Sequence, residues 1–141
     1  MLLTRLLPLT PAHAAVAATV QARCFETAWD TPAMATVLTM PGIFGWLALT
    51  GDDATGMIIG WRVLDETEIL MIGVVPEARR LGLGQRLVMR TKGTTTFLEV
   101  AVDNSAALAF YRNLGFERVG HRPGYYQRSD GTTIDALILR A

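Results

Sequence analysis

The sequence lacks several features that mark particular classes of protein. Its 141 residues include one cysteine, Cys24, and two histidines, His13 and His121. A single cysteine excludes an internal disulfide framework and fits a reducing compartment. Two isolated histidines form no metal-ligand cluster, so no metal is predicted. We therefore expect a cytoplasmic protein that works without a metal ion.

Excess charge and long apolar runs are also missing. Thirteen Lys and Arg residues balance thirteen Asp and Glu residues, which gives a formal net charge of +0. Balanced charge leaves no global field that would attract nucleic acid or an anionic membrane, so neither is predicted as a partner. No stretch approaches the ~20 apolar residues of a membrane span. The length and the 50% hydrophobic content predict one globular domain over residues 1–141.

The N-terminal segment has two possible interpretations. Residues 1–15 combine an arginine, an apolar stretch and Ala12-His13-Ala14, which loosely matches a signal peptide with its cleavage site. However, Pro8 and Pro11 interrupt the apolar run, and Thr10-Pro11 is typical of a helix cap followed by the first helical residue. We expect the segment to belong to the folded structure.

The rest of the pattern predicts a mixed α/β domain, with helices and strands in the order β-α-α-β-β-β-α-β-α-β-β. Helices are predicted at residues 11–23, 31–40, 82–92 and 104–114, and Thr31-Pro32 is expected to start the second. Strands are predicted at 2–7, 43–49, 56–63, 68–75, 95–102, 116–126 and 133–139. Short turns join the strands between residues 43 and 75, which indicates an antiparallel meander. Gly93 is expected to stop the third helix at its C′ position.

The turn before the third helix has the chemistry of an anion site. It reads Arg79-Arg80-Leu81-Gly82-Leu83-Gly84 and follows Pro76, which ends the preceding strand. The first turn of a helix offers unpaired N–H groups and partial positive charge, and glycines let a ligand approach the backbone. Arginines can fork onto phosphate oxygens. The alternative is a plain loop with solvated arginines, because isolated glycine-rich matches are common.

Val74-Val75-Pro76 and the turn that follows resemble motif A of the GNAT superfamily of N-acetyltransferases, [Q/R]-x-x-G-x-[G/A]. The resemblance implies an α/β fold with a mostly antiparallel, twisted sheet of about seven strands, flanked by about four helices. It also implies acetyl-CoA as co-substrate, with its pyrophosphate on the turn and its pantetheine arm along the preceding strand. The implied cofactor-binding residues are Ile72, Gly73, Val74, Arg79, Arg80, Leu81, Gly82, Leu83, Gly84, Gln85 and Asn104.

A second informative stretch follows the third helix. Glu99 lies within the apolar strand 97–102, and Asn104 is a good N-cap for the next helix. Helical periodicity places Asn104, Leu108 and Tyr111 on one face. Taken alone, Tyr111 fits a packed core aromatic and Asn104 a simple cap.

Together with the tail, these residues resemble the ribosomal-protein-alanine N-acetyltransferases of the RimI type. The pattern comprises Leu98-Glu99-Val100, Asn104, Tyr111, Gly115-Phe116 and Tyr125-Tyr126. The resemblance implies acetylation of a protein N-terminal amine, belonging to a small-subunit ribosomal protein that begins with alanine. Glu99 would take the ammonium proton and Tyr111 would protonate the leaving thiolate, by direct attack in a ternary complex. Phe25 and Trp29 would form one wall of a peptide groove, and Tyr125 and Tyr126 the other.

Three departures from the family pattern keep alternatives open. Ala101 stands where the subfamily has arginine, the segment Leu87–Phe97 is short, and Phe25 and Trp29 are further apart than in the family's F-P-W segment. The short segment predicts a helix that ends early. One alternative is a related enzyme that acts on a small amine or a lysine. Another is a non-catalytic acyl-CoA-binding module, although cofactor binding alone needs neither Glu99 nor Tyr111.

Overall fold

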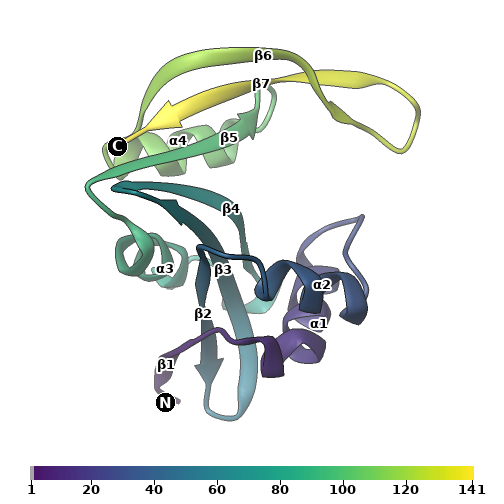
Figure 1. Cartoon of the computed structure of the whole chain (residues 1–141), viewed down its shortest axis with the longest axis vertical. Helices are drawn as coiled ribbons and strands as arrows, with labels where there is room; N and C mark the ends of the chain where they lie inside the picture. The colour runs from purple at the N-terminus through teal and green to yellow at the C-terminus, as the bar shows by residue number, and fades with distance from the viewer. Residues whose placement is uncertain (1) are drawn as a thin grey trace.

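The computed structural model describes residues 2–141, which form one seven-stranded sheet with helices on both faces (Figure 1). Met1, the first residue of the predicted N-terminal segment, lies outside the described residues. The strand order is β1-β2-β3-β4-β5-β7-β6. Neighbouring strands are antiparallel except β4 and β5, which run parallel. The meander predicted for residues 43–75 is therefore confirmed.

The elements follow the predicted order and type. The strands are β1 (Thr4–Pro8), β2 (Ile43–Thr50), β3 (Asp53–Val63), β4 (Glu66–Val74), β5 (Thr95–Ala101), β6 (Glu117–Gln127) and β7 (Thr133–Arg140). The helices are α1 (Ala14–Cys24), α2 (Thr31–Leu38), α3 (Leu83–Thr91) and α4 (Ser105–Asn113), with short 3-10 turns η1 (Pro11–His13) and η2 (Pro76–Ala78). The third helix ends at Thr91, in keeping with the short segment that follows it.

Two details of the helix ends differ from the sequence prediction. Asp30, not Thr31, caps α2, because its Oδ1 accepts a hydrogen bond from the Ala33 amide at 2.9 Å. Thr31 is therefore the first helical residue and Pro32 the second. Gly93 does follow the last turn of α3, but its φ is not in the left-handed region. A Cβ at Gly93 would lie 2.8 Å from Thr67 Oγ1, so glycine is needed for a close approach to β4.

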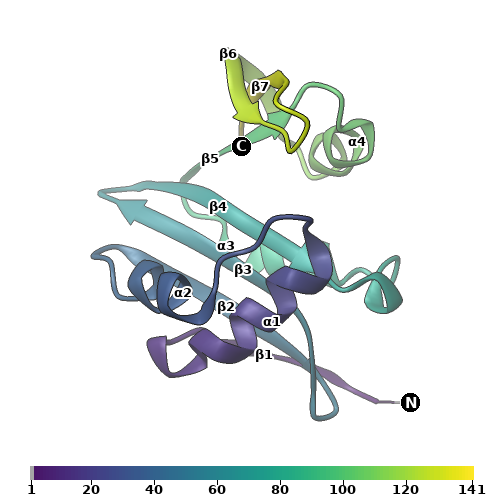
Figure 2. The same ribbon diagram turned by 90° about the vertical axis from the view of Figure 1, so that its right-hand side faces the viewer.

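The helices divide between the two faces of the sheet. One core packs α1 and α2 against β2, β3 and β4, and the other packs α3 and α4 against β4, β5 and β7. Figure 2 shows α1 and α2 together on one side of the strands. Each helix turns its buried residues toward the sheet, which is how a helix covers an apolar face.

The parallel pair β4–β5 is short, and this positions the site. Pairing covers only residues 66–68 of β4 with residues 95–97 of β5, after which the two strands diverge (Figure 2). A bulge accompanies the divergence, since Ile59 pairs with Met71 but Gly60 pairs with Ile69, which leaves Leu70 as an extra residue in β4. Bulges bend a strand and end its regular pairing. The β5 side of β4 beyond the bulge is thereby free to meet a ligand.

Candidate active site

Two adjoining cavities lie where β4 and β5 diverge. The first has a volume of about 650 Å³ and is lined by Cys24, Phe25, Ile72, Gly73, Val74, Ala78, Arg79, Arg80, Gly82, Leu83, Gly84, Gln85, Ala106, Ala107, Phe110 and Tyr111. The second has a volume of about 480 Å³ and is lined by Phe25, Ile69, Leu70, Met71, Ile72, Leu98, Glu99, Val100, Ala101, Asn104, Ala107, Tyr111, Tyr126 and Arg128. They share Phe25, Ile72, Ala107 and Tyr111, so material bound in one would meet material bound in the other at these side chains.

The first cavity ends at the uncapped start of α3. Gly82 is the N-cap residue, in the left-handed conformation with φ 80°, and no side chain satisfies the amides of the first turn. A Cβ built on Gly82 would have no atom within 4 Å, so the space in front of these amides is open. Arg80 also has a positive φ, 66°, which costs an arginine about 1 to 2 kcal/mol. This strained, open turn with free N–H groups is suited to a phosphate group.

Arg79 and Cys24, at the end of α1, both contact the end of β4 beside this turn. The Arg79 Nε donates a hydrogen bond to the Val74 carbonyl at 2.8 Å, which joins the turn to the end of β4. Burial raises the pKa of the Cys24 thiol, and the nearby Arg79 charge partly opposes that rise. A Cβ on Gly73 would lie 3.0 Å from the Cys24 Sγ, so glycine lets α1 pack directly on β4. The walls of the first cavity are therefore closely packed.

Helix α4 closes the first cavity through aromatic side chains. The Phe110 and Tyr111 rings meet edge to face at 5.0 Å, and Tyr111 meets Phe116 in the same way at 5.4 Å. A Cβ on Gly84 would lie 3.3 Å from Phe110 Cζ, so the second glycine of the turn admits this ring. The aromatic cluster holds Tyr111 in one orientation between the two cavities.

Tyr111 is buried but lines both cavities. Its exposed fraction is 5%. Burial, with a smaller contribution from Tyr126, raises its pKa to about 12. The phenol is therefore protonated throughout the physiological pH range, and its hydroxyl is a permanent hydrogen-bond donor at the junction of the cavities.

Glu99 supplies the carboxylate of the second cavity. Alternation along β5 places Leu98 and Val100 in the core, and Glu99 on the opposite face, where its side chain is 12% exposed. Its Oε1 lies 3.3 Å from the Arg122 Nε. Its Oε2 is buried and has no hydrogen-bond partner among residues 2–141. A buried, unpartnered carboxylate oxygen is costly, which favours a ligand that donates a hydrogen bond to it.

The two tyrosines of β6 lie differently with respect to the second cavity. Tyr126 lines it and donates a hydrogen bond to the Glu99 carbonyl at 3.1 Å, across β7. Burial, and then the Glu99 charge, raises the Tyr126 pKa to about 12. The Tyr125 ring packs edge-on against Tyr126 at 4.9 Å and is 46% exposed, outside the cavity lining.

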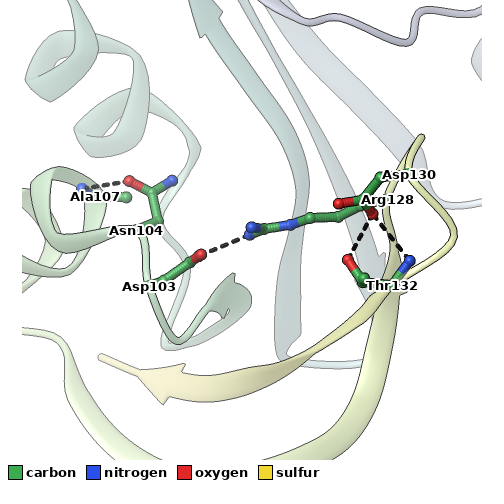
Figure 3. A network of polar contacts seen from close by, with 6 residues as sticks. All are labelled: Asp103, Asn104, Ala107, Arg128, Asp130 and Thr132. Carbon is green, nitrogen blue, oxygen red and sulfur yellow. Dashed lines mark hydrogen bonds and ion pairs between the residues drawn. The ribbon is translucent and has the colours of Figure 1, made fainter.

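Charged and polar contacts lie beside the second cavity, which Asn104 and Arg128 line (Figure 3). The Arg128 guanidinium donates a hydrogen bond to Asp103 Oδ1 at 2.8 Å, which joins the β6–β7 loop to the loop before α4 (Figure 3). In the same loop, Asp130 accepts hydrogen bonds from the amide and hydroxyl of Thr132 at 2.9 and 2.6 Å. The Ser129 hydroxyl reaches Glu26, in the α1–α2 connection, at 3.2 Å. These contacts thus join three separate segments of the chain.

The structure brings together most, but not all, of the residues predicted for the site. Glu99 and Tyr111 both line the second cavity, and Phe25 lines both cavities. Of the predicted cofactor residues, only Leu81 and Asn104 lie outside the first cavity. Leu81 is exposed, whereas Asn104 lines the second cavity and caps α4 by accepting from the Ala107 amide at 3.2 Å (Figure 3). Trp29, like Tyr125, lines neither cavity.

Some site residues were missed by the sequence analysis. Ala107 lies four residues before Tyr111, so helical spacing could have placed it on the same face of α4. Phe110 has no such signal, because an apolar residue next to Tyr111 looks like core. Arg122 and Arg128 depend on how β6 is registered on β7, in which Arg122 pairs with Ala136. That register is set by packing across the sheet and was not apparent from the local sequence.

The family follows from the comparison with known sequences. The model of the Acetyltransferase (GNAT) family matches residues 16–116, well over half of the chain. The chain therefore belongs to the GNAT family of acetyltransferases. The predicted fold class is confirmed, with its mixed α/β sheet of seven strands and helices on both faces.

Two relatives that the chain matches carry related names. Over 79 residues the chain is 43% identical to N-alpha-acetyltransferase RimI of Mycobacterium tuberculosis, covering 53% of this chain and 48% of that protein. It is 39% identical over 101 residues to the [Ribosomal protein bS18]-alanine N-acetyltransferase of Salmonella typhimurium, covering 66% and 68% of the two chains. The alignment thus spans about half the length of the first relative and about two thirds of the second.

A solved structure extends the likeness over the whole fold. The crystal structure of the ribosomal-protein-S18-alanine N-acetyltransferase from Escherichia coli matches with a TM-score of 0.87 and 26% identity, covering 98% of this chain and 92% of that one. The similarity to the RimI type is therefore confirmed. Among the described residues, no helix has both the length and the apolar character needed to cross a membrane.

Proposed function

We propose that residues 1–141 form a single acetyltransferase domain that transfers the acetyl group of acetyl-CoA to the N-terminal amine of a protein. The acceptor that we propose is a small-subunit ribosomal protein that begins with alanine. The names of the relatives in Mycobacterium, Salmonella and Escherichia support this choice. A cytoplasmic location, where ribosomal proteins are made, fits this acceptor.

The observation that carries the proposal is the meeting of two cavities at Tyr111. The first cavity ends in a phosphate-type turn, and the second contains the buried, unpartnered Oε2 of Glu99. We assign the first to acetyl-CoA and the second to the acceptor. Arg79, Arg80 and the first-turn amides of α3 would hold the pyrophosphate, and β4 beyond its bulge would pair with the pantetheine arm. When bound, acetyl-CoA supplies the activated acyl group and a thiolate leaving group.

Glu99 acts as the base in this proposal. An amine attacks a thioester only when neutral, and a protein N-terminal amine with a pKa near 8 is about one-tenth neutral at pH 7. Lysine, near 10.4, is neutral in only about one molecule in 2,500. The ammonium N–H bond breaks and the proton passes to a Glu99 oxygen, directly or through a water, so the carboxylate becomes a carboxylic acid.

Tyr111 acts at the leaving group. Its protonated hydroxyl lies at the junction of the cavities, where the sulfur would depart. A phenol with a pKa of about 12 is a weak acid. We therefore expect it to assist mainly by donating a hydrogen bond as negative charge develops on sulfur. As the carbon–sulfur bond breaks, the phenol passes its proton to the sulfur, and the proton lost from the nitrogen of the tetrahedral intermediate restores the phenol, so that a neutral amide and the CoA thiol leave. Cys24 lines the same cavity, but this route needs no covalent enzyme intermediate.

The chemical character of the lining of the second cavity favours an extended peptide over a polycation. Its lining is mostly apolar, with Glu99 as its only carboxylate and Arg128 on its rim. A polyamine site would be expected to contain several carboxylates. Phe25 and Tyr126 supply aromatic walls, and Trp29 and Tyr125, which stand outside the cavity, remain proposed contacts for later residues of the peptide.

A competition experiment tests the acceptor. An alanine-starting peptide, its N-blocked, lysine-containing counterpart and spermidine are offered together with acetyl-CoA, and thiol release is corrected for hydrolysis. Fastest acetylation of the alanine peptide is expected. Faster reaction of the lysine peptide or of spermidine would limit the proposal to general acetyl transfer. Absence of transfer to any amine, with acetyl-CoA still bound, would indicate the non-catalytic module.

A further inference from the structure

We propose that Arg122 is a positioning residue for Glu99, which holds one carboxylate oxygen so that the other faces the acceptor amine. The inference rests on the proposed acetyl transfer, in which Glu99 takes the ammonium proton. Arg122 comes from β6, two strands away from β5, and was not among the site residues assigned from the sequence. It lies outside the lining of both cavities, so it would act through Glu99.

The contacts of Arg122 fix its guanidinium from two directions. Its Nε lies 3.3 Å from Glu99 Oε1, and its Cζ lies 4.9 Å from the centre of the Tyr125 ring. Stacking of arginine on an aromatic ring limits the freedom of a long side chain that is otherwise 53% exposed. Held in this way, the guanidinium occupies Oε1 and leaves Oε2 without a partner. Oε1 of Glu99 is thereby held by Arg122, and Oε2 is left to face the acceptor amine.

The other groups around Glu99 include Tyr125, whose pKa is raised by burial and then by the Glu99 charge and by hydrogen bonding to that carboxylate. Glu68 on β4 pairs with Phe97, two residues before Glu99 on β5. Burial and the Glu99 charge raise the Glu68 pKa, and Arg122 lowers it. Tyr111 and Tyr126 are neutral at physiological pH, and Arg128 is engaged by Asp103. Arg122 is thus the cation in direct contact with the Glu99 carboxylate.

The test compares Arg122→Gln with Arg122→Lys and with Arg118→Gln as the matched control. Arg118 is a second exposed arginine of β6, and no ion pair joins it to another described residue. The acidic limb of the kcat/KM pH profile is measured with the alanine peptide. In Arg122→Gln the midpoint of this limb is expected to move to higher pH by about half a pH unit to one pH unit. A larger shift is not expected, because the Arg122 side chain is half exposed and solvent screens its charge. Arg122→Lys, which keeps the charge, should recover most of the wild-type profile.

A second measurement does not depend on turnover. The carboxyl ¹³C resonance of Glu99, assigned by its loss in Glu99→Gln, is titrated in each protein. Its midpoint should rise in Arg122→Gln and stay at the wild-type value in Arg118→Gln. An unchanged midpoint in Arg122→Gln, or an equal rise in both variants, overturns the inference. If the wild type acetylates no amine, the proposed function fails, and the carboxyl titration still decides the role of Arg122.

Discussion

Strands β3 and β6 both contain eleven residues, but they have opposite surroundings. In β3, six consecutive residues from Thr55 to Gly60 are buried between helices on both faces of the sheet. In β6, no residue is fully buried, and the strand forms the edge of the sheet. The first strand lies in the half that carries the phosphate-type turn, and the second in the half that carries the Arg122 and tyrosine contacts of Glu99.

The two halves therefore differ in their exposed polar contacts. Both bury apolar residues, and burial of this kind is insensitive to pH. The half with β5 to β7 also has polar contacts at its exposed edge, among them Arg128 with Asp103 and Ser129 with Glu26. Exposed contacts of this kind are individually weak and easily replaced. On the proposed assignment, the acceptor site lies in the half with more of these exposed contacts, and we expect it to be the more easily altered of the two sites.

The largest expected effect tests the cofactor half. Gly82→Asp would place a carboxylate in the open space before α3, against the proposed pyrophosphate. Like-charge contact costs several kcal/mol, so acetyl-CoA affinity should fall by about 10³-fold. Calorimetric titration with acetyl-CoA measures the loss.

Gly82→Asn is the matched control, because asparagine has nearly the same shape and also tolerates a positive φ. It should retain affinity within about tenfold, and both variants should show a similar small decrease in melting temperature, because either side chain is strained at the positive φ of this position. Equal acetyl-CoA affinities for the aspartate and asparagine variants would show that the pyrophosphate does not bind at this turn. The cofactor site could then not be assigned to the half with β1 to β4.

The fold was largely predictable because its signals are local. The turn before α3 combines glycine, arginine and a preceding proline within nine residues, and helical and strand periodicities mark the other elements. Even the capping error at α2 was a shift of one residue, from Asp30 to Thr31. The first cavity is built mainly from such contiguous segments, and eleven of its lining residues were predicted from sequence, nine as cofactor contacts together with Phe25 and Tyr111.

The acceptor site was less predictable because it is assembled from distant segments. The contact between Arg122 and Glu99 requires the β6–β7 register, which contains two irregularities. The bulge at Leu70, which separates β4 from β5, has no glycine or other local signal. Asn104 shows the same limit, since its capping role was predictable but its place in the second cavity was not. These features depend on tertiary packing.

The second largest effect is expected for a change at Tyr111, where the two cavities meet. Tyr111→Phe keeps the packing with Phe110 and Phe116 and removes only the hydroxyl. Turnover with the alanine peptide should fall by about 10² or more, with little change in acetyl-CoA affinity. Steady-state kinetics and calorimetry measure the two quantities separately. Equal turnover would make Tyr111 a packing residue, and a large loss of affinity would assign it to the cofactor side.

The smallest expected effect concerns pH and separates the two halves directly. The Gly124 amide donates a hydrogen bond to Asp135 Oδ1 at 2.7 Å, and this contact, with His121, holds the Asp135 pKa below its ordinary value. Hydrogen bonding from Arg128 lowers the Asp103 pKa in the same way. A lowered pKa in the folded state means that these contacts stabilise the hairpin above the ordinary carboxyl value, about 3.9, and that the stabilisation is lost as pH falls further.

Amide hydrogen exchange, expressed as protection relative to the intrinsic rate, measures this loss residue by residue. Between pH 6 and pH 3 the protection of the Gly124 amide should fall severalfold, while the buried amides of β3 keep theirs. Asp135→Asn is the control, because its carbonyl oxygen can still accept the hydrogen bond but does not titrate. Its Gly124 amide should show little dependence on pH over this range. If protection in the wild type falls equally in β3 and at Gly124, the halves unfold together, and a separately adjustable acceptor half is ruled out.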